Sequence, residues 1–142
     1  MDGFVLFLHA LGALTVGFYL LFPFVAGSIK GLGPQAQAGF ARVLRSLNRI
    51  GQWLLLVQFL TGGYLISKYD LSTAWMIVVI VLMVALFGVT GMLGGPLKRI
   101  AADGGEGKAA AAADASKLTT FGGIAAVLVL ALLVLMYYPN LL

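Results

Sequence analysis

His9 is the side chain whose chemistry stands out in this sequence, because it is the only histidine and cysteine is absent. It lies about five residues inside a long uncharged segment, or roughly 8 Å along a helix. A neutral imidazole nitrogen is a good axial ligand for haem iron. Gly12 and Ala13 share the face of His9 one helical turn further on, and Gly17 follows, so a flat macrocycle could lie against them. These residues predict a haem b site in which His9 is the metal ligand and His9, Gly12 and Ala13 are the binding residues.

Three interpretations of His9 stay open at this point. As a structural residue it would hydrogen-bond a neighbouring helix, with Thr61 or Tyr64 as the partner. As a haem ligand it would leave the other axial position to a weak ligand, to water, or to His9 of another subunit. As a proton or metal carrier it would act without cysteine, whose absence excludes disulfides and thiolate metal sites. No catalytic residue is predicted, and an enzymatic role is not favoured.

The composition places His9 in a membrane protein. Of 142 residues, 61% are hydrophobic and only 10% are charged, and the mean hydropathy is +1.04. A water-soluble fold of this size would expose too much of that apolar surface. Apolar segments cover residues 4–29, 50–67, 73–93 and 121–138, each close to the length that crosses a bilayer as a helix. We therefore expect one all-α domain over residues 1–142, an integral membrane four-helix bundle.

Proline and glycine set the expected helix boundaries. Pro23 should kink the first span near its inner end, and Pro34 is well placed as the first residue of the next helix. The sequence from Gly94 to Pro96 should end the third span, and Pro139 should end the fourth. Residues 101–117 are rich in Ala, Gly and charge, which is typical of a solvated connection.

An amphipathic extension precedes the second span. Between residues 36 and 50 one stripe holds Phe40, Val43, Leu44 and Leu47, and another holds Arg42, Arg45 and Arg49. This pattern predicts a helix that lies in the cytoplasmic interface and contacts anionic lipid headgroups.

The basic residues also predict orientation. Eight of the nine lysines and arginines flank the first and third connections, and Lys68 is the exception. By the positive-inside rule these connections are cytoplasmic, so the protein is a multi-pass protein of the cell membrane with the N- and C-termini outside. Because topology and the lipid bilayer account for the basic residues, no nucleic-acid partner is predicted.

Small and polar residues indicate how the spans would associate. The third span presents Gly88, Gly91, Gly94 and Gly95, which predicts close packing there, and Gln52 and Gln58 are each expected to make one interhelical hydrogen bond. The two glutamines are six residues apart and do not share a face, which argues against a pore. The aromatic belts at the membrane surfaces are expected to contain Tyr69, Trp75, Tyr137 and Tyr138.

The sequence resembles the small four-span membrane proteins of the HemJ-type protoporphyrinogen oxidases and the CopD-like copper-resistance proteins. The similarity rests on Phe7 to Leu11, the basic stretch from Arg42 to Arg49, Gly62-Gly63 and Trp75. It implies that His9 matches the histidine that HemJ-type enzymes need for haem and activity. Those enzymes carry a lysine after the tryptophan, whereas here Trp75 is followed by Met76 to Val79, so the oxidase activity is not carried over. A lone His9 without cysteine also makes a poor copper path.

The leading hypothesis is therefore a non-enzymatic bundle or accessory subunit that binds haem b through His9, as a homo-oligomer or with a membrane-complex partner. The alternatives are a HemJ-type haem-dependent membrane oxidoreductase and a small-solute or metal transporter. The scarcity of polar residues within the spans makes the transporter the least favoured of the three.

Overall fold

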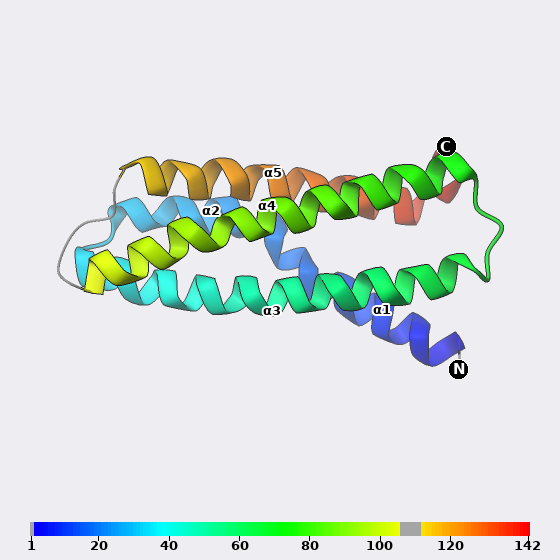
Figure 1. Cartoon of the computed structure of the whole chain (residues 1–142), viewed down its shortest axis with the longest axis horizontal. Coiled ribbons are helices and arrows are strands. Elements are labelled where there is room, and N and C mark those ends of the chain that lie inside the picture. The colour runs from blue at the N-terminus through cyan, green and yellow to red at the C-terminus, as the bar shows by residue number, and fades with distance from the viewer. Residues whose placement is uncertain (1, 106–111) are drawn as a thin grey trace.

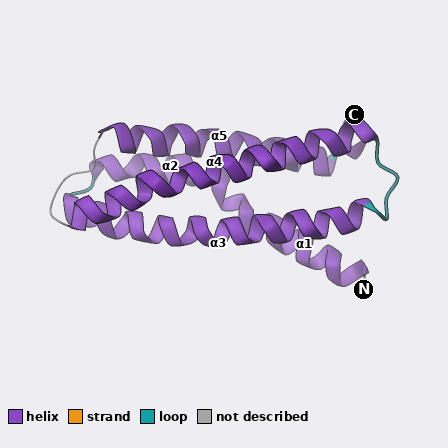
Figure 2. Ribbon diagram, viewed as in Figure 1, coloured by secondary structure: helices purple, strands orange, loops and turns teal. Residues whose placement is uncertain are grey.

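The computed structural model describes residues 2–105 and 112–142, and every regular element there is helical (Figure 2). The predicted all-α class is confirmed. A first helical region is divided into four pieces, and three long helices follow it. The elements are α1 (Asp2–Val16), η1 (Gly17–Leu20), α2 (Phe22–Gly27), η2 (Ser28–Gly31), α3 (Pro34–Ile66), α4 (Thr73–Gly105), α5 (Ala112–Tyr137) and η3 (Pro139–Leu141).

The three long helices lie side by side along the long axis of the bundle, each antiparallel to the next (Figure 1). The first region crosses the bundle diagonally: α1 packs against α3, whereas η1 and α2 pack against α5. Both termini lie at the same end as the turn between α3 and α4. This arrangement brings the first region against α5 through η1 and α2 and lets α1 diverge from α5 toward the end that holds the termini.

Pro23 explains the break in the first region. It occupies the first turn of α2, and it has no N–H to donate to the carbonyl of residue 19, with which its ring would also clash. The turn before it is a 3₁₀ segment, η1, and Leu21 separates η1 from α2. The predicted kink is therefore present, but it falls in the turn that precedes Pro23, near the middle of the segment rather than at its inner end.

The predicted amphipathic extension is not a separate element, because α3 runs without interruption from Pro34, its predicted first residue, to Ile66. Its N-terminal half packs into the bundle through Ala41 and Leu44, whereas Val43 and Leu47 are exposed. The apolar stripe inferred from the sequence is therefore only partly correct. Packing against α4 fixes which face of this half-helix is buried.

The prediction that Gly94 to Pro96 ends the third helix is wrong. α4 continues through Pro96 to Gly105. A proline inside a helix removes one hydrogen bond, and the contacts of the following turns can offset that loss. Here Leu97 and Ile100 are fully buried in the same core as Leu44 of α3 and Leu118 of α5. Near this end the Arg99 guanidinium also binds the Asp114 carboxylate, with Nη2 2.9 Å from Oδ1.

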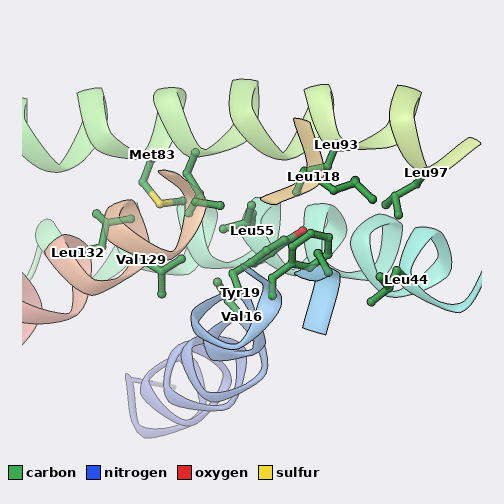
Figure 3. Packing of buried hydrophobic residues seen from close by; sticks show 14 of the residues in the cluster. Val16, Tyr19, Leu44, Leu55, Met83, Leu93, Leu97, Leu118, Val129 and Leu132 are labelled. Atoms are coloured by element: carbon green, nitrogen blue, oxygen red, sulfur yellow. The ribbon is translucent and has the colours of Figure 1, made fainter. Parts of the chain in front are cut away.

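A buried polar network joins the first region to α3 and α4. The Tyr19 hydroxyl donates to Asn48 Oδ1 over 2.7 Å, and Asn48 Nδ2 donates to the Thr90 carbonyl over 2.9 Å. Figure 3 shows Tyr19 among the apolar core residues contributed by all the long helices. A Cβ at Gly51 would lie 2.6 Å from the Tyr19 hydroxyl oxygen, so only glycine at this position lets the two helices meet around that ring.

The sequence predicted that Trp75 lies in an aromatic belt, but the structure places it inside the bundle. Only 3% of it is exposed, and its indole Nε1 donates to the Leu135 carbonyl over 2.9 Å. In an α-helix that carbonyl would accept from the N–H four residues later, but this residue is Pro139, which has none. Trp75 therefore satisfies a carbonyl left free by the proline that ends α5. Tyr69, Tyr137 and Tyr138 are exposed.

The glycine face of α4 is mostly open within the chain, contrary to expectation, although a Cβ at Gly91 would lie 3.7 Å from Gln52 Nε2 of α3. Gly88, Gly91 and Gly95 are exposed, and a Cβ at Gly88 or Gly94 would meet no atom within 4 Å. The close contacts occur instead where Gly12 and Gly51 face side chains of other helices.

Three helical regions are long and apolar enough to cross a membrane by length and composition: Gly3–Gly31, Thr73–Ala102 and Asp114–Tyr137. α3 is not among them. Its first half carries Arg42, Arg45 and Arg49, and its second half carries Gln52 and Gln58.

Candidate functional site

A cavity of about 580 Å³ lies in the half of the bundle that holds the termini. It lies where α1 diverges from α5 on the N-terminal side of the break near Pro23, and residues of α1, α3, α4 and α5 line it. Its size falls within the range of pockets that hold cofactors and other small ligands. The lining is almost entirely apolar and includes His9, Ala13, Gln58, Gly62, Met76, Val79, Met83, Val129, Leu132 and Met136.

His9 lies on the wall of this cavity and is held by α3. Its Nδ1 is 2.8 Å from Thr61 Oγ1, which confirms the predicted contact with Thr61. The Thr61 hydroxyl donates its single proton to the Val57 carbonyl over 2.8 Å. With the hydroxyl proton on that carbonyl, Thr61 accepts from His9 Nδ1, and in this tautomer Nε2 keeps its lone pair.

The free nitrogen is the chemically useful feature of the site. Nε2 has no hydrogen-bond partner among the described residues. A hydrogen bond from Nδ1 to a neighbouring oxygen is the usual way in which a protein fixes a histidine so that Nε2 can bind a metal. The pair of His9 and Thr61 thus presents one neutral nitrogen ligand to an apolar cavity.

Gly62 allows His9 to approach α3 so closely. A Cβ at this position would lie 3.2 Å from His9 Cε1, closer than ordinary van der Waals contact. The sequence contained a usable signal here, because Thr61 and Gly62 are adjacent and topology placed Thr61 at the depth of His9. Gly62 was nevertheless not predicted to be a site residue.

The structure separates the two small residues predicted to flank His9. Ala13 lines the cavity, but Gly12 is buried against α3, where a Cβ would lie 2.3 Å from Gln58 Oε1. The space beside Gly12 is therefore filled by Gln58 and is closed to a macrocycle. Gly17 does not line the cavity either, although a Cβ there would meet no atom within 4 Å.

Gln58 is a further polar side chain at the contact between α1 and α3. Its Oε1 is buried without a hydrogen-bond partner, so the predicted interhelical hydrogen bond is not formed. Gln52 also lacks a partner among the described residues. Buried amides normally pair, which makes Gln58 a second polar group available at the cavity wall.

The donor set limits what this site can hold. No group of three or more His, Cys, Asp or Glu side chains comes together in the described part of the chain, so a bare metal ion would lack ligands there. A metal that brings its own planar set of nitrogen ligands needs only one or two from the protein. The apolar walls and the single imidazole suit such a cofactor better than a free ion or a polar substrate.

Comparison with known protein families, with curated proteins and with solved structures finds no match for this chain. The resemblance to HemJ-type and CopD-like proteins therefore stays a prediction, and the site must be interpreted from its own geometry.

Proposed function

We propose that the chain crosses the cell membrane four times with both termini outside. Three regions meet the length and composition of a span, and α3 lies beside α4 along its length (Figure 1), so a bilayer that holds α4 also surrounds much of α3. Leu14, Phe24, Val81 and Val84 are largely exposed on the outside of the bundle, where lipid would cover them. The described basic residues other than Lys68 lie on η2, on the first half of α3, near the end of α4 and near the start of α5, away from the termini, which supports this orientation.

Within that bundle the cavity lined by His9 binds haem b, with His9 Nε2 as an axial ligand. The observation that carries this proposal is the contact of His9 Nδ1 with Thr61, which leaves Nε2 without a hydrogen-bond partner among the described residues at the wall of a large apolar cavity. The porphyrin ring of haem supplies the equatorial nitrogen ligands of the iron, so the protein needs to provide only axial ones. The thioethers of Met76, Met83 and Met136 line the same cavity and are candidates for the weak second ligand.

The role proposed for the bound haem is that of an accessory or binding subunit rather than an oxidase. In the HemJ-type enzymes a lysine follows the tryptophan of the third span, but here Met76 and Val79 occupy the cavity wall after Trp75. The described lining contains no lysine or carboxylate, so His9 alone would have to ligate iron and move protons.

Absorption spectroscopy of protein purified after expression with added haem tests this proposal. We expect a Soret band that shifts with dithionite, and we expect His9→Ala to abolish it. Ala13→Leu, which places a larger side chain on the cavity wall, should weaken it. A colourless wild-type protein, or a band unchanged by His9→Ala, would remove the proposed ligand and leave His9 a structural residue.

Thr61 provides the control on geometry. Thr61→Val removes the oxygen that accepts from Nδ1, so haem affinity should fall about 10- to 100-fold, whereas Thr61→Ser should retain it. Thr119→Val is the matched variant, because Thr119 hydrogen-bonds its own helix outside the cavity, and it should leave the band unchanged. Coloured protein that fails to oxidise protoporphyrinogen would favour the accessory role, whereas oxidation that depends on His9 would favour the enzyme.

A further inference from the structure

A second cleft, of about 330 Å³, lies between α3 and α4 and shares no lining residue with the haem cavity. Its lining combines Arg49 and Gln52 with Trp53, Leu56 and Phe87. A cation, an amide and an exposed indole thus adjoin apolar side chains in one groove. This mixture distinguishes the cleft from the almost wholly apolar cavity around His9.

The polar groups of the cleft are not satisfied within the chain. Arg49 is exposed and has no ion-pair partner among the residues whose side chains are described. The Gln52 amide likewise has no hydrogen-bond partner there. Its Nε2 lies over Gly91, where a Cβ would be 3.7 Å away, so the glycine leaves room for the amide at the mouth of the cleft. The Arg49 guanidinium can only donate, and the Gln52 amide can donate through Nε2 as well as accept through Oε1, so the pair favours an anionic ligand.

The depth of Arg49 narrows the choice of anion, given the proposed four-span topology. Arg42 lies two helical turns nearer the inner end of α3, so Arg49 lies roughly 10 Å deeper along the helix. A guanidinium at that depth is costly unless it reaches the headgroups or meets an anion. A soluble anion would have to enter the membrane to bind it, whereas an anionic lipid is already part of the leaflet, and the long arginine side chain can extend toward its phosphate.

We propose that this cleft binds one anionic phospholipid of the inner leaflet. The phosphate lies against the Arg49 guanidinium, whose planar fork matches phosphate oxygens, and accepts a hydrogen bond from the Gln52 amide. Trp53, which is 70% exposed, lies at the level of the glycerol, and an acyl chain covers Leu56 and Phe87. A second copy of the chain fits this cleft less well, because a two-fold contact here would bring two Arg49 side chains together.

The test uses the whole protein, purified in detergent without added haem, so that it is independent of the His9 site. Native mass spectrometry and thermal unfolding would be recorded with phosphatidylglycerol, with phosphatidylcholine of the same acyl chains, and with inorganic phosphate. We expect one phosphatidylglycerol to remain bound and to raise the melting temperature, and the other two additions to have little effect. Arg49→Gln should weaken phosphatidylglycerol binding at least tenfold, and Gln52→Leu should weaken it less.

Arg42→Gln is the matched control, because Arg42 is exposed on the same helix but does not line the cleft. It should leave the bound lipid in place. Equal losses in the Arg42 and Arg49 variants would show a general attraction to anionic lipid and would overturn the specific site. Equal stabilisation by phosphatidylcholine or by inorganic phosphate would also overturn it. A dimer that dissociates on Arg49→Gln would assign the cleft to a second copy instead. None of these lipid results bears on the haem proposal, which is tested by the loss of the Soret band in His9→Ala.

Discussion

At the scale of single residues, the polar side chains inside this bundle mostly bind backbone carbonyls or one another across helices. The pair of Trp75 and Leu135 is the clearest case, because Pro139 leaves the Leu135 carbonyl without its helical donor and the indole supplies one. The His9 ring also hydrogen-bonds across helices, through Nδ1 to Thr61. Its second nitrogen, Nε2, has no hydrogen-bond partner among the described residues. A polar side chain in such an apolar chain therefore either hydrogen-bonds a backbone group that lacks its helical partner or indicates a candidate binding site.

Trp75→Phe should lower the free energy of unfolding by about 1–2 kcal/mol, because the Leu135 carbonyl would be buried without a donor. Equilibrium unfolding in detergent, followed by circular dichroism, measures the change. Trp53→Phe is the matched control, since Trp53 is exposed and donates no hydrogen bond to a described residue. Equal effects of the two variants, in detergent without added lipid, would contradict the proposed importance of this hydrogen bond.

At the scale of elements, the break before Pro23 is the feature that creates the cavity around His9. It separates α1, which packs on α3, from α2, which packs on α5. If the first region were one straight helix along α5, the space between His9 and Leu132 would be filled. The binding site thus depends on a proline that does not line it.

Pro23→Ala should allow the first region to form a continuous helix, since residue 23 would regain a donor for the Tyr19 carbonyl. α1 should then move toward α5 and narrow the cavity. Spin labels at Phe4 and Tyr137, both exposed, should move closer together in pulsed electron resonance measurements, and the Soret band should weaken. Pro34→Ala is the control, because Pro34 occupies the first turn of α3, where no helical donor is needed. An unchanged distance in the Pro23 variant would mean that packing alone holds the break.

At the scale of the whole molecule, the fold gathers both termini and the turn between α3 and α4 at one end. The cavity around His9 lies in that half, and the cleft lined by Arg49 lies near the middle of α3 and α4. With the proposed orientation, the cavity lies on the outer side of the cleft. The two sites can therefore be tested separately.

Single cysteines at Asp70 and Asn140 should react with an impermeant thiol reagent added to intact cells, and one at Leu32 should not. All three positions are exposed, and the natural chain contains no cysteine that would give a background. Labelling after permeabilisation provides the control for reactivity at Leu32. Reaction of the Leu32 variant alone in intact cells would reverse the orientation, and with it the assignment of the cleft to the inner leaflet.

The sequence by itself predicted much of the local structure. The all-α class, the start of α3 at Pro34, the end of α5 before Pro139 and the contact between His9 and Thr61 all follow from local signals. Proline acts on the backbone of its own turn, and a lone histidine in an apolar helix needs a polar partner at its own depth. Such effects can be inferred without knowing how the helices pack.

Which faces of the helices meet is apparent only from the packed fold. Gly12 and Gly51 lie at close contacts, whereas the more conspicuous glycines of α4 face outward, and Trp75 lies inside. In a soluble helix the polar face marks the outside. Here both the bundle core and the lipid expected around it are apolar, so hydropathy cannot distinguish a core face from a lipid face. Shape complementarity and a few hydrogen bonds make that choice. They also determine the cavity, because it arises from where α1 diverges rather than from any pattern along the chain.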